Sequence, residues 1–341
     1  VLFNGDLTAN ADVKFYCTGG GVAEFVTQHD PPNSDLEFRK GTYVFTGDYD
    51  TPDGASAQRI RFSNSDGTNP RKIHIASAAG DSVFSNDWLM MTRGSAYYQE
   101  FRVKAPTTYT KLTGEFRVWD ALWCVVEDGI RLEIAGNVND EDAAATLYFS
   151  GGGTTEFTKA DGTSYSSPLI LSNGTMLVSN TSGSALDGDV TVCSGAVFGG
   201  AGSADATLTT DAGGTLSPGA SVGTLGLGNL TMDAGAIYAC EFDGASADEI
   251  AVTDTLDLSG AEENSVTVDV NVISGASGAQ PIFSYTTLSG STNALFVDLS
   301  GTMYSNYILS EDGDSIDLEL VPEPGVIGLA LIAGFALLRR R

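Results

Sequence analysis

Glycine recurs at a nearly regular interval between residues 165 and 260, where each glycine separates two short runs of apolar and β-branched residues. The corner glycines are Gly174, Gly195, Gly213, Gly235 and Gly260, at intervals of roughly 20 residues. Such an interval is the length of one coil of a solenoid, whose coils stack on one another. Glycine suits the corner because a tight turn between two faces often requires a positive φ. The pattern predicts an all-β fold, a right-handed parallel β-helix (solenoid).

Apolar residues flank these glycines, and we expect them to stack coil on coil along the interior. They are Val190, Val192, Val197, Leu208, Leu216, Leu230, Met232 and Ile237. The alternative is a β-sandwich whose hairpins recur at a similar spacing. Hairpins favour Asn-Gly loops, and the array contains one such pair, Asn173–Gly174. We therefore favour the solenoid.

Short alternating runs such as TYVFTG, RIRF and KIHI also recur before the array, and their β-branched and aromatic residues are typical of strands. We divide the chain into three parts. Residues 1–150 form a β-rich N-terminal part of the solenoid, and residues 151–320 form the repeats and the C-terminal coils. Residues 321–341 form a separate segment with a short hydrophobic helix.

The chain is strongly acidic, with a formal net charge of -27 across 341 residues. Such a surface repels nucleic acid, so we expect no nucleic-acid partner. Hydrophobic residues make up 42% of the chain, which is enough to bury a sizeable core.

Residues 151–258 resemble the autotransporter-associated β-strand repeat. The resemblance rests on NGTMLV (173–178), VTVCSGAVFGG (190–200), GGTLSPGASVGTL (213–225) and LTMDAGAIYACEF (230–242). It implies a right-handed β-helix displayed outside the cell, and it does not by itself imply an enzyme.

The C-terminal segment VPEPGVIGLALIAGFALLRRR has an unusual composition for the end of an acidic chain. Residues 325–338 form an uncharged run, which as a helix spans about 21 Å. A bilayer core of about 30 Å calls for about 20 residues, so the length is marginal. The terminal arginines favour a cytoplasmic C-terminus. A buried helix that caps the solenoid is the alternative, although a cap would be amphipathic.

The segment resembles the PEP-CTERM sorting signal, in which a Pro-Glu-Pro motif precedes a short hydrophobic helix and a basic end. The motif is Pro322, Glu323 and Pro324; the membrane segment includes Val326, Leu331, Phe335 and Leu338; the basic end is Arg339, Arg340 and Arg341. The resemblance implies export, transient residence in the inner membrane and recognition by an exosortase-type membrane protease. The destination it implies is the cell surface or the extracellular matrix.

Several acidic clusters are candidates for a metal site. The first is Asp48, Asp50 and Asp53, but its spacing does not match an EF-hand loop. The others are Asp140, Glu141 and Asp142, and Asp312, Asp314 and Asp317. Aspartate in turns and on solvated edges explains all three. We therefore expect no cofactor, and weak calcium binding is the alternative.

The sequence gives little support for catalysis. With 44 acidic residues, some carboxylate pair will fit any spacing, and neither His29 nor His74 has a triad context. A denser basic patch could line one face of a sheet: Arg59, Arg61, Arg71, Lys72, His74 and Arg93. Lyases of acidic sugars need a basic groove, which 17 basic residues spread over an acidic chain do not supply.

Aromatic residues form a candidate platform for stacking sugars: Trp88, Tyr97, Tyr98, Trp119 and Trp123. Core packing is the alternative that we favour. Four cysteines (Cys17, Cys124, Cys193 and Cys240) show no zinc spacing, and we expect them to be buried, with any disulfide pairing left open.

Two functions remain. The first is a structural or adhesive protein of the cell envelope or extracellular matrix, associated with polysaccharide, which is not an enzyme. The second is a carbohydrate-active β-helix enzyme, a polysaccharide lyase or glycosidase, that uses the same sorting segment.

Overall fold

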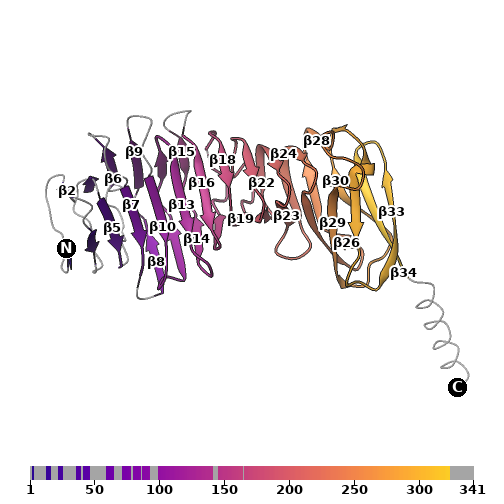
Figure 1. Ribbon diagram of the computed structural model, residues 1–341, viewed down its shortest axis with the longest axis horizontal. Helices are drawn as coiled ribbons and strands as arrows, with labels where there is room; N and C mark the ends of the chain where they lie inside the picture. Colours follow the sequence, from indigo (N-terminus) through magenta and orange to yellow (C-terminus); the bar gives the residue numbers. More distant parts are fainter. Residues whose placement is uncertain are drawn as a thin grey trace, which may run out of the picture.

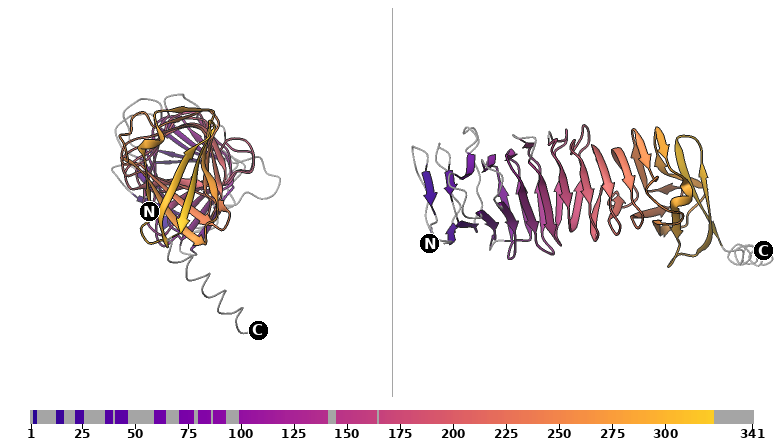
Figure 2. Two further views of the ribbon diagram at one scale, coloured as in Figure 1. Left: turned by 90° about the vertical axis from the view of Figure 1, so that its right-hand side faces the viewer. Right: turned by 45° about the horizontal axis from the view of Figure 1, so that its top comes forward.

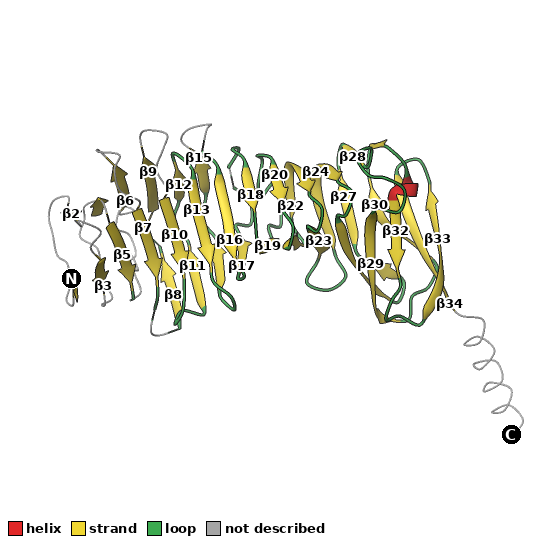
Figure 3. Ribbon diagram, in the orientation of Figure 1, coloured by secondary structure: helices red, strands yellow, loops and turns green. Residues whose placement is uncertain are grey.

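The computed structural model shows an elongated, all-β molecule (Figure 1). It describes residues 2–3, 13–16, 22–25, 36–39, 41–46, 59–64, 71–77, 80–85, 87–92, 99–140, 145–163 and 165–322. Within these residues there are 34 strands and a single helical turn, the 3-10 helix η1 (Thr292–Ala294), drawn red in Figure 3. The strands form three sheets that run along the long axis.

Sheet A has 17 strands and extends along the whole described length. Its strands, in order of pairing, are β1 (Leu2–Phe3), β3 (Val22–Phe25), β5 (Gly41–Phe45), β7 (Arg71–Ile75), β10 (Gln99–Val103), β13 (Leu122–Val126), β16 (Leu147–Gly151), β18 (Leu169–Leu171), β20 (Val190–Val192), β22 (Ser203–Thr210) and β24 (Thr224–Met232). They are followed by β27 (Glu249–Val252) and β28 (Thr255–Asp257), β30 (Ala279–Ser284) and β31 (Thr287–Ser289), and finally β34 (Ser315–Pro322) and β33 (Tyr304–Glu311).

Sheets B and C form the other walls (Figure 2, left, looks along the axis). Sheet C contains β8 (Asp81–Phe84), β11 (Tyr109–Leu112), β14 (Arg131–Ile134), β17 (Thr154–Phe157), β19 (Gly174–Val178), β21 (Ala196–Gly200), β23 (Thr215–Pro218), β25 (Ile237–Asp243), β29 (Val266–Ser274) and β32 (Leu295–Asp298), with β26 (Ser246–Ala247) beside β25. Sheet B contains β2 (Val13–Tyr16), β4 (Leu36–Arg39), β6 (Arg59–Asn64), β9 (Asp87–Thr92), β12 (Phe116–Val118) and β15 (Val138–Asp140).

Strands of successive coils pair in parallel and in register, so equivalent side chains stack in ladders. On sheet A one inward ladder is Leu122, Leu147, Leu169, Val190, Leu208, Leu230 and Leu256. Each of these side chains is at most 1% exposed. Their neighbours in sequence point outward because side chains alternate along a strand. The all-β expectation is confirmed, and the stacked parallel sheets are consistent with a parallel solenoid.

The corner glycines behave as expected at four of the five positions. Gly174, Gly195, Gly213 and Gly235 have φ between 79° and 89°. Gly260 is not among the glycines with positive φ, so that assignment is wrong. In its coil the left-handed residue is Asn264, at φ 57°. The adjacent Ser265 carbonyl accepts the Gly235 N–H at 2.7 Å, which continues the hydrogen-bond column of the corner. Asparagine tolerates this conformation better than most side chains.

The interior predictions are correct at six of eight positions. Val197 and Ile237 are only half-buried, because they pair with Thr215 on the outward side of sheet C. The inward ladder of this sheet passes through Phe198, Leu216 and Tyr238. Phe198 and Tyr238 each lie one residue after the residue that was predicted to be buried. A shift of one residue turns a side chain to the opposite face.

The C-terminal end of sheet A changes direction. β34 is antiparallel to both β30 and β33, so the last strands form a hairpin across the end of the parallel stack (Figure 1). The expected C-terminal hydrophobic helix lies outside the described residues.

Candidate functional site

The outer face of sheet A carries a row of large polar and aromatic side chains between β7 and β16. Lys72, Glu100, Trp123 and Tyr148 are in register on four successive strands. Each step of this row corresponds to one complete coil of the chain. Because the coils stack in register, residues far apart in sequence become neighbours on one surface.

Glu100 is the centre of a charge network on this face. Its carboxylate is 2% exposed and lies 2.7 Å from Arg102 Nε, 3.1 Å from His74 Nε2 and 3.7 Å from Lys72 Nζ. Arg102 also contacts Glu127, with Nη1 3.2 Å from Oε1. Such pairing is what allows a carboxylate to remain ionised when it is buried.

The pKa values of two bases in this network shift in opposite directions. Burial lowers the pKa of His74, and the nearby Lys104 charge adds to this effect, against the hydrogen bond with Glu100 that raises it. The hydrogen bond with Glu100 raises the pKa of Arg102 despite partial burial. Arg102 is therefore the fixed cation of the network.

Trp123 and Tyr148 form a parallel stack beside this network. Their ring centroids are 4.7 Å apart and their planes differ by 6°. This separation matches the distance between neighbouring strands, about 4.8 Å, so the stack follows the axis of the solenoid. In this arrangement each ring presents one face to the other ring. The two rings therefore belong to the outward-facing row that also contains Lys72 and Glu100.

The candidate sugar platform does not form as one surface. Trp88 is fully buried inside the stack, in sheet B, whereas Trp123 lies on the outer face of sheet A. Trp119 follows β12 and is half-buried. Tyr97 and Tyr98 lie outside the described residues. Core packing is therefore correct for Trp88 and wrong for Trp123.

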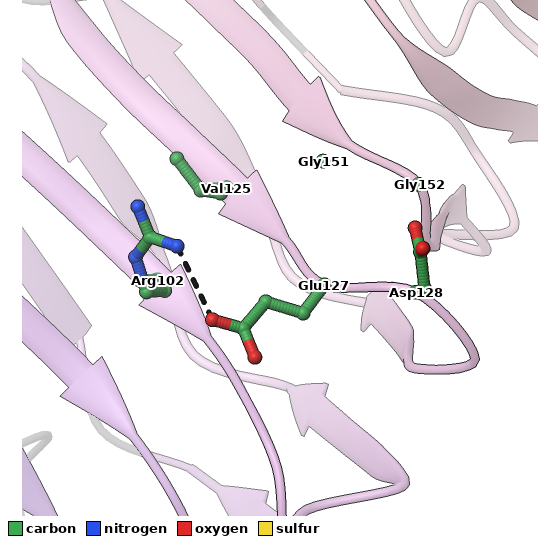
Figure 4. Close-up of a pocket in the computed structure, with 6 residues that line it drawn as sticks. All are labelled: Arg102, Val125, Glu127, Asp128, Gly151 and Gly152. Carbon is green, nitrogen blue, oxygen red and sulfur yellow. Dashed lines mark hydrogen bonds and ion pairs between the residues drawn. The ribbon is translucent and has the colours of Figure 1, made fainter.

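An open pocket of about 400 Å³ lies at the end of β13, where the chain turns out of sheet A (Figure 4). It is lined by Arg102, Val125, Glu127, Asp128, Gly151 and Gly152. In the close-up the Glu127 carboxylate points toward Arg102, whereas the Asp128 carboxylate points toward Gly152. The two carboxylates are directed apart, which differs from the facing pair that glycoside hydrolysis uses.

The basic patch is divided between two walls of the solenoid. Arg59 and Arg61 belong to β6 in sheet B, whereas Arg71, Lys72 and His74 belong to β7 in sheet A. Arg93 lies outside the described residues. A single basic face is therefore wrong for the described members of the patch.

Sheet C carries a second charge network around Glu133. Its carboxylate lies 2.8 Å from Lys111 Nζ, accepts a hydrogen bond from Thr158 Oγ1 at 2.8 Å, and accepts another from the Tyr109 hydroxyl. Burial acts to raise the pKa of Glu133, but these three hydrogen bonds outweigh it and lower that pKa to about 2. Burial and the same hydrogen bond raise the pKa of Tyr109 to about 12.

Asp248 is a buried carboxylate that sequence reasoning did not identify. It is 1% exposed, and its two oxygens accept the backbone N–H groups of Gly223 at 2.8 Å and Glu241 at 2.9 Å. Burial nevertheless raises its pKa to about 6. These bonds join the β23–β24 connection to β25. A single aspartate in a Gly-, Ser- and Ala-rich turn gives no sequence signal for this role.

The candidate metal ligands are not assembled into a site in the described part of the chain. Asp140 accepts hydrogen bonds from Ser166 at 2.8 Å and Ser167 at 2.5 Å, and Asp312 and Asp314 belong to the β33–β34 turn. No group of three potential metal ligands occurs among the described residues. Asp48, Asp50, Asp53, Glu141 and Asp142 lie outside them.

The described cysteines form no disulfide. Cys124 and Cys240 are buried and Cys193 is half-buried, and all three are free thiols. Burial raises the pKa of each of these thiols, which opposes formation of the reactive thiolate. Cys17 lies outside the described residues.

Residues 219–223 read GASVG, the G-x-S-x-G spacing of a hydrolase nucleophile elbow. An elbow requires a strand that leads directly into a helix. Here the segment connects β23 to β24, so it leads from one strand into another. The motif therefore lacks the context that would expose a nucleophile.

Val321 and Pro322 are the last two residues of β34, and they are the only members of the sorting segment that the structure describes. Glu323, Pro324, Val326, Leu331, Phe335, Leu338, Arg339, Arg340 and Arg341 lie outside the described residues. Among the residues that are described, no helix has the length and apolar character needed to cross a membrane. No protein-family model matches the chain, and no curated protein matches it either.

Proposed function

We propose that this chain is an exported structural or adhesive protein of the cell envelope or extracellular matrix. Its body is a right-handed parallel β-helix with autotransporter-associated repeats, and an exosortase-type membrane protease sorts it through the C-terminal segment. The observation that carries the proposal is the order Pro322-Glu323-Pro324, an uncharged run at 325–338 and three terminal arginines. The solenoid is exported across the inner membrane and is delivered to polysaccharide at the cell surface.

The outward ladders of the body support a structural role. Thr191, Thr209 and Thr231 stack on three successive strands of sheet A, on the face opposite the leucine ladder. Threonine is favoured on pleated, half-exposed surfaces and offers a hydroxyl to solvent or to a hydrated polymer. The charge networks also support it, because their acids are already paired with bases of the same protein. A long surface of paired charges and small hydroxyls suits adhesion.

The test expresses the full chain in two otherwise identical hosts, one with an exosortase and one without. Mass spectrometry of the C-terminus then measures whether the tail is removed. We expect loss of the tail only in the host with the exosortase. Glu323→Ala should reduce this processing, whereas the matched control Glu319→Ala, just upstream on β34, should not. An intact tail in both hosts would refute the sorting proposal.

A further inference from the structure

β33 is an exposed edge strand at the C-terminal end of the solenoid (Figure 2, right). Within the described part of the chain it pairs with β34 alone, through the residues from Tyr304 to Glu311. Backbone N–H and C=O groups of an antiparallel strand alternate between its two sides. The side of β33 away from β34 therefore presents a row of donors and acceptors that another strand can pair with.

The side chains of β33 do little to discourage such pairing. Ile308 is 53% exposed and Tyr307 is 36% exposed, and the only charged residue of the strand is Glu311 at its end. Proteins usually protect an edge with charges, proline, bulges or a very short strand. The one irregularity in the pairing of β33 lies at its beginning, between Tyr304 and Asn306.

The neighbouring end strand is protected in the usual way. β32 is the last strand of sheet C, and it has four residues and an aspartate at its end, Asp298. β33 has eight residues, of which the first seven are uncharged. The contrast singles out β33 as the edge suited to a partner.

We propose that β33 pairs antiparallel with β33 of a second copy of this chain, forming a two-fold dimer end to end. A two-fold axis beside Ile308 places Ile308 opposite Ile308 of the partner subunit and Tyr307 opposite Leu309 of the partner subunit. Apolar residues that lie opposite each other stabilise paired strands. A self-complementary strand of this kind is what a two-fold interface requires.

Charge limits where a second copy can bind. Each copy carries a net charge of -27, so contacts between most surfaces repel. The pairing places Glu311 of each copy opposite Ser305 of the other, toward the two ends of the interface, so no acidic residues of β33 face each other. The interface is small, and we expect weak binding.

The dimer goes beyond the proposed function and does not depend on processing of the tail. The chain leaves β34 at Pro322, which pairs with Tyr304 at the beginning of β33. The described chain therefore ends beside the beginning of β33, and the segment that follows, residues 323–341, is the competing occupant. Dimerisation is measured in solution, so its failure leaves the sorting proposal standing.

The test uses the full chain in detergent, studied by sedimentation velocity over a hundredfold range of concentration. We expect reversible dimers, and Ile308→Lys should raise the dissociation constant at least about tenfold. Val83→Lys is the matched control, because Val83 is 41% exposed on β8, far from this edge, and should leave the dimer unchanged. Circular dichroism checks that both variants keep the wild-type strand content.

Cross-linking locates the interface independently. Ile308→Cys should give a disulfide-linked dimer on mild oxidation, and Val83→Cys should not. A chain that stays monomeric at every concentration would overturn the proposal and would indicate an edge that is empty or covered by the chain's own tail. Dimers that Ile308→Lys does not weaken would also overturn it and would indicate association through the tail.

Discussion

The coils before residue 140 and those between residues 145 and 232 fill their interiors differently. In the first region Trp88 contacts Phe45, Phe84 and Phe101 edge to face, with ring centroids 6.0, 5.4 and 5.5 Å apart. In the second region, the inward ladder on sheet A is aliphatic and runs through Leu169, Val190, Leu208 and Leu230. Both interiors are closely packed and both bury rings, since Phe157, Tyr165 and Phe198 are buried in the second region, but the cluster of three rings around a tryptophan belongs to the first.

Coil length explains the difference. The coil from Ile73 to Phe101 is long and includes strands from sheets A, B and C, whereas the coil from Val190 to Leu208 is shorter and includes none from sheet B. A longer coil encloses a larger cross-section, and protein interiors are filled to nearly constant density. Aromatic residues and a third sheet supply the volume in the first region. Buried loop residues such as Tyr165 and Leu186 close the third side in the second.

The largest expected effect comes from removing a ring at the centre of the first region. Trp88→Ala should lower the free energy of unfolding by about 4 to 5 kcal/mol, because the cavity lies among several rings that cannot all move inward. Leu208→Ala, the matched truncation in the second region, should cost about 3 kcal/mol. Urea denaturation measures both. Equal costs would contradict the view that the first region depends on large rings.

The second prediction concerns close approach between short coils. Gly200 has φ of 108°, and a Cβ there would lie 2.1 Å from the Val178 carbonyl oxygen of the preceding coil. Gly200→Ala should therefore cost about 3 kcal/mol of stability through backbone strain and steric clash. Gly195→Ala is the control, because Gly195 has φ of 80° but nothing within 4 Å of its Cβ position, and it should cost about 1 kcal/mol. Thermal or urea unfolding measures both variants, and the difference between them gives the cost of the steric clash apart from the backbone strain. If both variants lose the same stability, the coils are not tightly stacked at Gly200.

The third prediction concerns acid stability, which we assign to the first region. The folded pKa of Glu133 is about 2, below the value of an unfolded glutamate, about 4.3. The unfolded chain therefore takes up a proton first on acidification, and stability is lost as the pH falls through this window. Glu133→Gln should reduce the loss in free energy of unfolding across this pH window by about 1 to 2 kcal/mol.

Urea denaturation at several acidic pH values measures this loss. Glu262→Gln, at an exposed site, serves as the control. If Glu133→Gln keeps the wild-type acid dependence, the network around Glu133 does not stabilise the fold.

The smallest expected effect has the opposite sign and lies beyond the aliphatic coils. The folded pKa of Asp248 is about 6, above the unfolded value of about 3.9, so the native state binds the proton first. Its contribution to stability is complete below the unfolded pKa and is lost as the pH rises through about 6. Asp248→Asn should reduce this loss by about 1 kcal/mol.

Unfolding measured between about pH 4 and pH 7 tests this sign. Asp205→Asn, which changes an exposed carboxylate on β22, should leave the pH dependence unchanged. If the wild type and Asp248→Asn show the same pH dependence of unfolding, the two backbone hydrogen bonds to Asp248 offset the effect of burial on its pKa completely.

The candidate site was only partly predictable from the sequence. Lys72 and His74 stood out within a basic patch, but nothing near them in sequence indicated Glu100 as their partner. Trp123 stood out as an aromatic residue, whereas its partner Tyr148 did not. These pairs form because each coil brings its strand into register with the strand of the coil before it. The coils differ in length, and this variation hides the register in a single sequence.

The sequence by itself determined the coil and its corners. Positive φ is a local requirement, so glycines at Gly174, Gly195, Gly213 and Gly235 mark turns without reference to the rest of the chain. Only the tertiary structure decided that Val197 and Ile237 face outward and that the last strands turn antiparallel. Which face of a strand is buried depends on hydrogen-bonded register with neighbouring coils, and a shift of one residue reverses it.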